Sequence, residues 1–307
     1  MKRLVTLAIS IVLVFAFTLS AFAAEFTPIY GIDVSVWQGD INWGKVAGTD
    51  TEFAILRVGY NDKIDAQFEN NYNNAKANGV PVGVYMYSYA VTEQAAIEEA
   101  EIVLERIKGK QFEYPIYLDI EDAKLLKPEY GLTKEQRTKN ALAFVHKMQE
   151  NGYYVGVYAN LDWFTNYLDQ EAIGKECELW IAHYNDNVDY KDTAYGMWQY
   201  TDRGEIDGIT ENVVDLNICY KDYPTIIKNG GYNGFEKPTL EPSGIKGDVN
   251  ADGEMNLDDV VVLAQYVAGW SIVVSADGLN LNGDSEGKVD LDDVVWLAQK
   301  VAGWNLE

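Results

Sequence analysis

The sequence predicts an α/β protein built around a closed, irregular barrel and followed by a small all-α unit. Between Tyr30 and Tyr220, short apolar segments alternate with helix-like segments, a pattern typical of parallel strands joined by crossover helices. Eight such strands in about 190 residues, with little helical pattern between the later ones, indicate a barrel that lacks some of its helices. The all-α unit is predicted by an internal repeat near the C-terminus.

Each predicted strand is short, apolar and rich in β-branched or aromatic residues. The strands are expected over residues 31–36, 53–59, 82–89, 114–121, 154–159, 179–184, 195–200 and 214–219. Helices are expected between the early strands. Asp65, Thr92 and a capping box of Thr133 with Gln136 mark the starts of three of them, and a fourth covers residues 163–173.

The first 23 residues have the features of a secretory signal peptide. Lys2 and Arg3 precede an apolar run, and Ala21-Phe22-Ala23 matches the small-x-small cleavage pattern. The alternative is a membrane anchor, but the run is short for a span of about 20 residues. We therefore expect a secreted, extracellular protein with no membrane-spanning segment.

Composition narrows the choice of partners. The formal net charge of −24 argues against nucleic acid and against an anionic membrane surface. Only two cysteines occur, Cys177 and Cys219, and they are equally compatible with a disulfide and with two buried thiols. Neither histidine lies in a metal-ligand pattern, so we expect no metal or other cofactor in catalysis, and we expect a monomer.

Two carboxylates end the fourth predicted strand. Asp119 and Glu121 are two residues apart, so their side chains point to the same face of that strand. Two neighbouring acids cannot both ionise freely, which raises the pKa of one and suits it to protonate a leaving group. Asp33 on the first strand and Asp215 on the last would join them, because the first and last strands of a closed barrel are neighbours.

Aromatic residues accompany these acids near the strand ends. Aromatic rings stack on the apolar C–H faces of sugars, so a rim of this kind beside carboxylates favours a carbohydrate ligand. The alternative for each single residue is a place in the barrel core. The candidate sugar-contacting residues are Tyr87, Tyr89, Tyr158, Trp180, Tyr184, Trp198 and Gln199.

Five segments together resemble glycoside hydrolase family 25, the Chalaropsis-type lysozymes or N-acetylmuramidases. The resemblance covers residues 29–224 and implies an irregular TIM-like (β/α)5(β)3 barrel. It also implies cleavage of the β-1,4 bond between N-acetylmuramic acid and N-acetylglucosamine in peptidoglycan. The segments are Gly31-Ile-Asp-Val-Ser-Val-Trp-Gln-Gly39 with Ile41-Asn-Trp43, Tyr117-Leu-Asp-Ile-Glu121, Trp180-Ile-Ala-His-Tyr184, Trp198-Gln-Tyr200 and Val214-Asp-Leu-Asn217.

By this resemblance Glu121 is the general acid/base, and Asp119 orients the substrate's 2-acetamido group as that group attacks the anomeric carbon. Asp33 and Asp215 would position and tune this pair. Many relatives carry Thr/Ser-Glu-Gly after the second strand, where this chain reads Arg57-Val-Gly-Tyr60. The alternatives are hydrolysis of another N-acetylated glycan such as chitin, and a glycan-binding module without catalysis.

A Gly- and Pro-containing linker over 225–244 separates the barrel from the repeat. The segment 257–270 recurs at 291–304, and oxygen-bearing side chains precede each copy at calcium-loop spacing. The second loop has two possible registers, one starting at Asn282 with Glu286 as a ligand and one starting at Asn280 with an insertion. We expect two Ca²⁺ ions. The predicted ligands are Asp248, Asn250, Asp252, Asn256, Asp259, Asn282, Asp284, Asp290 and Asp293.

Residues 245–307 resemble a type I dockerin, a module that attaches secreted enzymes to the cohesin modules of a scaffoldin. The resemblance implies a cohesin partner and a position on a scaffold or cell surface. It assigns partner recognition to the pairs Leu257-Asp258 and Leu291-Asp292. Because both copies carry the same pair, either helix could face the cohesin.

Overall fold

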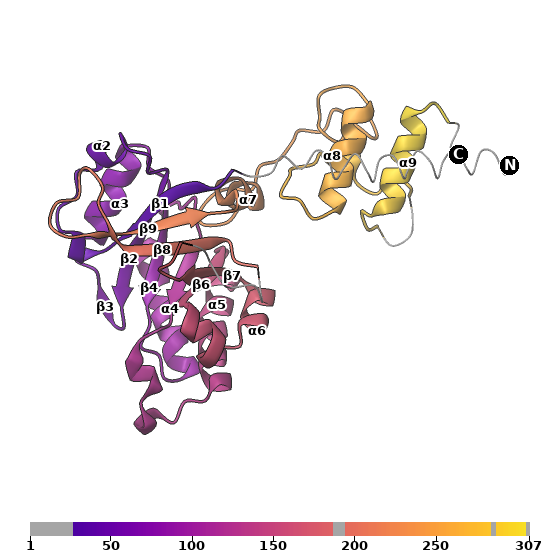
Figure 1. Cartoon of the computed structure of the whole chain (residues 1–307). Helices are drawn as coiled ribbons and strands as arrows, with labels where there is room; N and C mark the ends of the chain where they lie inside the picture. The colour runs from indigo at the N-terminus through magenta and orange to yellow at the C-terminus, as the bar shows by residue number, and fades with distance from the viewer. Residues whose placement is uncertain (1–26, 187–193, 284–286, 305–307) are drawn as a thin grey trace.

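A computed structural model describes residues 27–186, 194–283 and 287–304, which form a closed barrel followed by a two-helix unit (Figure 1). The barrel strands follow the order β1, β9, β8, β7, β6, β5, β4 and β2, and β1 also pairs with β2 and closes the ring. The predicted barrel and all its strands are confirmed. The strands are β1 (Ile29–Val34), β2 (Phe53–Tyr60), β4 (Val82–Tyr87), β5 (Ile116–Asp119), β6 (Val155–Asn160), β7 (Glu178–Ala182), β8 (Met197–Gly204) and β9 (Val214–Cys219).

Strand direction defines the two ends of the barrel. The strands from β1 to β8 in the ring run parallel, whereas β9 is antiparallel to both of its neighbours, β8 and β1. A short strand, β3 (Lys63–Ile64), extends β2 as a hairpin that the sequence did not predict. We call the end where the parallel strands finish the rim, and the opposite end the base.

One helix follows each of the first five barrel strands in the chain. Among the described residues no helix lies between β7, β8 and β9, so the arrangement is (β/α)5(β)3. The helices are α2 (Trp43–Val46), α3 (Phe68–Ala77), α4 (Glu93–Ile107), α5 (Lys134–Glu150) and α6 (Gln170–Glu176). Short helical turns occupy rim loops, namely η1 (Val36–Gln38), η2 (Ala123–Leu126), η3 (Pro128–Tyr130) and the π-helix η4 (Trp163–Tyr167).

The helix starts agree in part with the predictions. Thr92 and Thr133 are N-caps, and each hydroxyl accepts a hydrogen bond from the backbone N–H three residues on. The capping box at Thr133 is wrong in its second half, because the Gln136 side chain donates to Asn140 at 2.9 Å instead. The single helix expected over 163–173 is two helices, η4 and α6, separated by an extended residue, Leu168.

The barrel interior is filled with aromatic rings. Trp180 packs against Tyr117 and Tyr158, with ring centroids 5.0 and 4.5 Å away. Glycines make room for such rings, since a Cβ on Gly156 would clash with the ring of Tyr117. Outside the ring of strands, apolar side chains of the helices pack against outward-facing strand residues in a second, larger core.

A further helix, α7 (Tyr223–Gly230), closes the base of the barrel. Tyr223 and Ile227 are fully buried among the interior aromatics. The Tyr223 hydroxyl donates to Glu178 at 2.9 Å, and Lys221 forms an ion pair with the same carboxylate. The predicted linker therefore starts too early, because the chain still belongs to the barrel core after residue 225.

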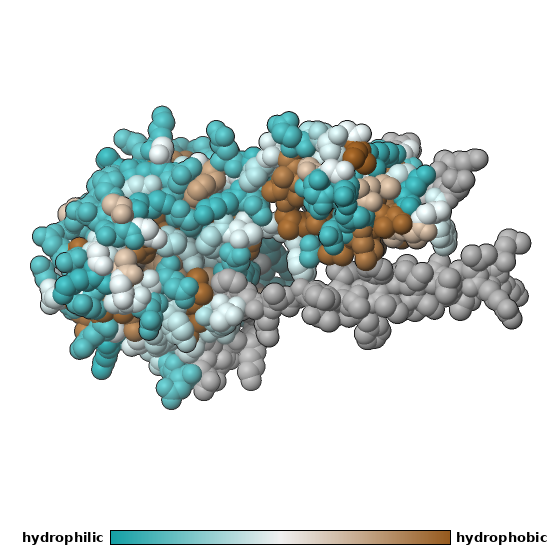
Figure 2. Space-filling model, turned by 90° about the horizontal axis from the view of Figure 1, so that it is seen from above, coloured by the Kyte–Doolittle hydropathy of each residue, from teal (hydrophilic) through white to brown (hydrophobic). Residues whose placement is uncertain are grey.

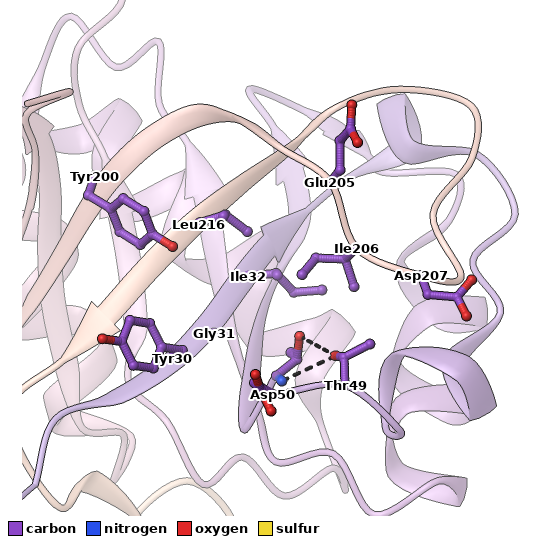
Figure 3. A pocket seen from close by; sticks show the side chains of 11 residues that line it. Tyr30, Gly31, Ile32, Thr49, Asp50, Tyr200, Glu205, Ile206, Asp207 and Leu216 are labelled. Atoms are coloured by element: carbon purple, nitrogen blue, oxygen red, sulfur yellow. Dashed lines mark hydrogen bonds between the residues drawn. The ribbon is translucent and has the colours of Figure 1, made fainter.

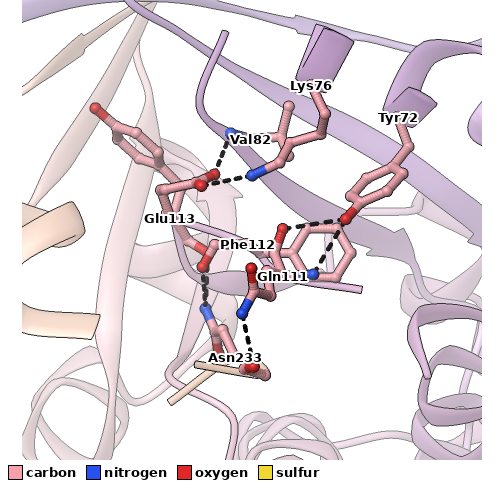
Figure 4. Close-up of polar contacts among 9 residues, drawn as sticks. Tyr72, Lys76, Val82, Gln111, Phe112, Glu113 and Asn233 are labelled. Carbon is pink, nitrogen blue, oxygen red and sulfur yellow. Dashed lines mark hydrogen bonds and ion pairs between the residues drawn. The ribbon is translucent and has the colours of Figure 1, made fainter. Parts of the chain in front are cut away.

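Asn233 fastens the segment after α7 to the same end of the barrel (Figure 4). Its Nδ2 donates to the carbonyls of Phe112 and Tyr114 at 3.2 and 2.9 Å, and its Oδ1 accepts from Tyr154 N–H at 2.8 Å. The residue is fully buried and has a left-handed φ of 54°. The connection without regular structure thus begins after Phe235, about ten residues later than the predicted start of the linker.

The C-terminal unit pairs two helices, α8 (Leu257–Val267) and α9 (Leu291–Val301), with a short turn η5 (Ala276–Gly278) between them. Its small core includes Val249, Leu263 and Leu297. Hydrophobic residues also gather on its surface (Figure 2). The exposed ones are Ile245, Leu257, Tyr266, Trp270, Leu279, Leu291, Val295 and Trp304.

Cys177 and Cys219 are both free, which settles the alternative left open by the sequence. The predicted signal peptide lies outside the described residues. In the part of the chain that is described, no helix has both the length and the apolar character needed to cross a membrane.

Candidate active site and calcium loops

The strands bring the four predicted acids together at the rim, on the inner side of the barrel. Asp33 on β1 lies directly opposite Asp215 on β9 in the antiparallel ladder. Asp119 ends β5, and Glu121 follows two residues later on the same face. The four are near enough that the charge of Asp33 acts on the other three. The expected convergence is therefore present.

Asp33 and Asp215 form a carboxyl pair that shares a proton. Burial raises the pKa of Asp33, although its hydrogen bonds oppose the rise. Burial and, to a smaller extent, the adjacent Asp33 carboxylate together raise the pKa of Asp215 to about 9. Because Asp215 keeps its proton at neutral pH, it donates to the ionised Asp33.

A polar network built from β8 and β9 holds Asp33 in place. Gln199 Nε2 and Asn217 Nδ2 both donate to Asp33 Oδ2 at 2.8 Å. Trp180 Nε1 in turn donates to Asn217 Oδ1 at 2.8 Å, and Tyr158 OH donates to Gln199 Oε1 at 2.9 Å. These bonds fix the amide orientations, so both amides present N–H groups to Asp33.

Glu121 is half-buried and therefore reachable from solvent. Burial raises the pKa of Glu121 above its ordinary value. The hydrogen bond that its Oε2 accepts from Asn160 N–H at 2.8 Å lowers the pKa and offsets part of this rise. A raised pKa keeps this carboxyl group protonated closer to neutral pH. Glu121 is thus able to donate a proton to a ligand at the rim.

Asp119 is 5% exposed, and its Oδ1 is buried without a hydrogen-bond partner. Burial raises the pKa of Asp119 well above its ordinary value, and the charges of Glu121 and Asp33 add to the rise. A buried carboxyl oxygen without a partner is costly, so a ligand donor at this position would gain a strong hydrogen bond.

Burial divides the predicted sugar-contacting residues into two groups. Tyr184 is 53% exposed, and its hydroxyl donates to Gln199 at 2.9 Å. Tyr87 and Tyr89 are half-buried, with ring centroids 5.3 Å apart, and the Tyr87 hydroxyl donates to Asp122. These three side chains are placed to contact a ligand at the rim.

The other predicted contacts are buried, and here the expectation is corrected. Trp180 is 1% exposed and belongs to the barrel core, because it lies one layer below the rim. Tyr158 and Gln199 are 6% and 2% exposed and support Asp33 through hydrogen bonds. Trp198 points outward from the barrel, where its Nε1 donates to His183 O.

Two further residues at the rim end of the barrel were not predicted as site residues. Trp37, in the loop after β1, is 68% exposed, and a hydrogen bond from Gln38 Nε2 to Val213 O fixes this loop. Arg57 on β2 points inward, and its charge lowers the pKa of Asp119. Asp65 holds Arg57 in place by accepting a hydrogen bond from its Nε at 2.7 Å. Helix α3 starts at Phe68 with Gln67 as its N-cap, so the predicted cap at Asp65 is wrong.

Comparison with known proteins identifies the barrel. The model of glycosyl hydrolases family 25 matches residues 32–209, more than half of the chain. The chain belongs to glycosyl hydrolases family 25. The uncharacterized protein YegX of Escherichia coli O157:H7 is 31% identical over 198 residues, which cover 62% of this chain and 69% of YegX. Lysozyme M1 of Streptomyces globisporus is 26% identical over 200 residues, covering 62% of this chain and 67% of that protein.

Among solved structures, the modular autolysin LytC from Streptococcus pneumoniae is similar to the family 25 barrel. It has 30% sequence identity and a TM-score of 0.57, over 63% of this chain and 47% of LytC. The chain therefore matches about half the length of LytC. LytC has also been solved in complex with a synthetic peptidoglycan ligand. Family membership makes the barrel a glycoside hydrolase.

Beyond the family 25 barrel, the first predicted calcium loop closes through bonds from its own amides. Asp248 accepts from the N–H groups of Asp252 and Gly253 at 3.1 and 2.9 Å, and Asp259 accepts from Val249 N–H at 2.7 Å. Gly253 has a φ of 92°, as the turn at position six requires. No group of three or more His, Cys, Asp or Glu side chains among the described residues is gathered for a metal.

The second loop favours the register that starts at Asn280. Leu281 then matches Val249, and both are buried in the small core. Asn282 N–H donates to Asp293 Oδ1 at 2.9 Å. In the first loop Asn250 N–H donates to Asp259 Oδ1 in the same way. Asn280 Oδ1 is buried without a partner among the described residues, so an uncompensated oxygen is available to a cation.

Two more of the predicted calcium ligands begin helices, and two candidate ligands lie outside the described residues. Asn256 and Asp290 are the N-caps of α8 and α9, and each forms a full capping box. Asp284 and Glu286 lie outside the described residues. The predicted ligands of both loops offer only carboxylate and amide oxygens, which are the ligands that Ca²⁺ prefers. A carboxylate oxygen that already accepts one N–H keeps a second lone pair with which it could bind the ion.

Proposed function

We propose that the barrel hydrolyses the β-1,4 bond between N-acetylmuramic acid and N-acetylglucosamine in peptidoglycan. The observation that supports this most is the buried, unpartnered Oδ1 of Asp119 beside the half-buried Glu121. The N–H of a 2-acetamido group is a donor of the right kind for that oxygen. The likeness to lysozyme M1 and to LytC, which was solved with a peptidoglycan ligand, supports the same substrate class.

The proposed reaction has two steps. Glu121 donates its proton to the glycosidic oxygen, and the bond from that oxygen to the anomeric carbon breaks. The acetamido oxygen of the same sugar attacks the anomeric carbon while Asp119 accepts a hydrogen bond from the acetamido N–H. The Glu121 carboxylate then removes a proton from water, which opens the cyclic intermediate and restores the starting enzyme.

Asp33 and Asp215 influence Glu121 and Asp119 through their charge. Because the two share a proton, they present about one negative charge instead of two near Asp119. Arg57 adds a positive charge on the inner side of β2. Together these groups set how readily Asp119 ionises when the acetamido N–H arrives.

The test replaces Glu121 with Gln. We expect Glu121→Gln to lower the rate of clearing of a cell-wall suspension by about 10²–10⁴, because the general acid is lost. Glu129→Gln, which changes an exposed glutamate of η3, is the matched control and should keep the parent rate. Clearing at the parent rate by folded Glu121→Gln would contradict the proposal.

The fragments released by the parent distinguish the bond that is cut. Mass analysis of digested, purified peptidoglycan should find N-acetylmuramic acid at the new reducing ends. New ends at N-acetylglucosamine, or hydrolysis of chitin in preference to peptidoglycan, would overturn the assignment of substrate.

We further propose that the protein is secreted and that its C-terminal unit is a calcium-dependent dockerin that binds a cohesin. The duplicated helices, with Leu257 and Leu291 51% and 67% exposed, support this proposal. Each lies beside an aspartate, Asp258 or Asp292, at the start of its helix. Apolar side chains exposed at the same place in both repeats suit a partner surface.

Calcium removal tests the docking proposal. The loops cannot gather their oxygens without an ion, so EDTA should weaken binding to immobilised cohesin by at least tenfold, and added Ca²⁺ should restore it. The double variant Leu257→Ala/Leu291→Ala should bind weakly even with Ca²⁺ present. Tight binding that EDTA leaves unchanged would contradict the role of calcium.

A further inference from the structure

A groove lies on the outer wall of the barrel (Figure 3). Its lining residues Ile32 and Leu216 neighbour Asp33 and Asp215 in the chain but face the opposite side of the strands. It occupies the side formed by β1, β9 and β8, where no helix among the described residues covers the strands. The groove has a volume of about 370 Å³, within the range of sites that bind small molecules. Its lining residues are Tyr30, Gly31, Ile32, Thr49, Asp50, Thr51, Tyr200, Glu205, Ile206, Asp207 and Leu216.

One end of the groove is aromatic. Tyr30 on β1 is 51% exposed, and Tyr200 on β8 is half-buried. Both rings lie at the same end of the groove, with Leu216 of β9 between their strands (Figure 3). Ile32 and Ile206 complete the apolar floor. Exposed tyrosines above an aliphatic floor offer ring faces that an apolar side of a ligand would cover.

The other end of the groove is polar and acidic. Thr49 and Thr51, in the loop before β2, bond to each other through their hydroxyls at 2.9 Å. Asp50 and Glu205 are exposed, and their carboxylates contact no charged or hydrogen-bonding partner among the described residues. Asp207 forms an exposed ion pair with Lys45 at 3.0 Å. Carboxylates of this kind are free to accept hydrogen bonds from hydroxyl groups.

The aromatic end and the acidic end of the groove together favour one class of ligand. The free carboxylates repel anions, including a second copy of a chain whose net charge is −24. They are not gathered as a metal site in the described part of the chain. A neutral sugar satisfies both ends, because one face of a pyranose is apolar C–H and its edge carries hydroxyl donors.

We propose that this groove is a second glycan-binding site, which holds an uncharged sugar unit of the peptidoglycan strand on the barrel wall. Tyr30 and Tyr200 would contact the apolar sugar face, and Asp50 and Glu205 would accept hydrogen bonds from its hydroxyls. Such a site retains the protein on insoluble glycan while the rim acts on another part of the strand. The choice of peptidoglycan rests on the proposed function, whereas binding itself does not need hydrolysis.

The test separates retention from turnover. For the full-length double variant Tyr30→Ala/Tyr200→Ala, we expect about tenfold lower affinity for insoluble, purified peptidoglycan at 4 °C. Its turnover of a short soluble peptidoglycan fragment should stay within about twofold of the parent, because the rim acids are untouched. Tyr266→Ala, which removes a tyrosine of α8 that is 38% exposed, is the matched control for both measurements.

Conservative variants and a soluble probe complete the design. Tyr200→Phe keeps the ring face and should keep parent affinity, and it guards against a folding defect in the double variant. The neutral tetramer of N-acetylglucosamine should compete with the wall for the parent more strongly than for the double variant. Parent-like retention of the folded double variant would overturn the site. The site would also be overturned if sedimentation showed that the parent is a dimer and that the double variant is not, because lost retention would then reflect lost dimerisation. An equal loss of turnover of the soluble fragment by the double variant would overturn it as well. Failure of hydrolysis in the parent, with tyrosine-dependent retention intact, would refute only the proposed reaction.

Discussion

Replacing Asn233 with Ala should destabilise the barrel strongly, although the residue is far from the catalytic acids in the fold. The change removes three buried hydrogen bonds and leaves the carbonyls of Phe112 and Tyr114 and the N–H of Tyr154 without a partner. Stranded buried groups cost about 1–3 kcal/mol each, so three of them at the low end of that range, with partial relaxation of the segment, cost about 3–5 kcal/mol. The φ of 54° adds about 1 kcal/mol for alanine in the left-handed region.

The assay is thermal unfolding of the full-length chain, followed through the tryptophans buried in the barrel. For a domain of about 200 residues, 1 kcal/mol corresponds to about 2–4 °C, so the barrel transition should fall by about 10–20 °C. Asn233→Gly loses the same hydrogen bonds but tolerates the positive φ. It should therefore unfold a few degrees above Asn233→Ala. A decrease below about 3 °C for Asn233→Ala would refute the reasoning that this segment is part of the barrel.

Two further variants test side chains that support the rim. Burial raises the pKa of Glu99 to about 7, so its folded form prefers the proton, and the parent should lose about 3 kcal/mol of stability as pH rises from about 4.5 to 7. Glu99→Gln has no proton to lose and can still bond Ser88 and Tyr89, so its unfolding temperature should fall less between pH 5 and pH 8 than that of the parent. The dependence that remains comes from the buried acids at the rim, and a pH dependence equal to that of the parent would contradict the assignment. Trp180→Phe removes the donor to Asn217 and should lower kcat for a soluble fragment by about tenfold with little change in KM, whereas a rise in KM alone would restore Trp180 as a sugar contact.

Much of the fold followed from local pattern. Apolar segments of strand length and the Gly- or Pro-ended helices between them specified the barrel strands, and closure of the ring placed the first strand beside the last. That topology was sufficient to bring Asp33 next to Asp215, because the two residues lie near the rim ends of β1 and β9. Alternation along β5 likewise gave Asp119 and Glu121 a common face.

Depth along the barrel axis was harder to predict. A period of two tells which side of a strand a residue faces, but not how far below the rim it lies. Trp180 and Tyr184 share the inner face, yet one is 1% exposed and the other 53%, because β7 ends between them. Asn233 was missed for a related reason. Its partners are about 80 to 120 residues earlier in the chain, so its Gly-rich surroundings resembled a linker.

The reversed direction of β9 decides where the rest of the chain departs. Cys219, the last residue of β9, pairs with Ile29 at the start of β1, so the chain leaves the barrel at the end opposite the acids. A parallel last strand would instead have delivered α7 and the two-helix unit to the catalytic opening, where they would compete with an incoming polymer. If the C-terminal unit docks as proposed, this geometry keeps the catalytic opening facing away from the point of attachment, and a short tether is enough to leave the substrate's approach clear.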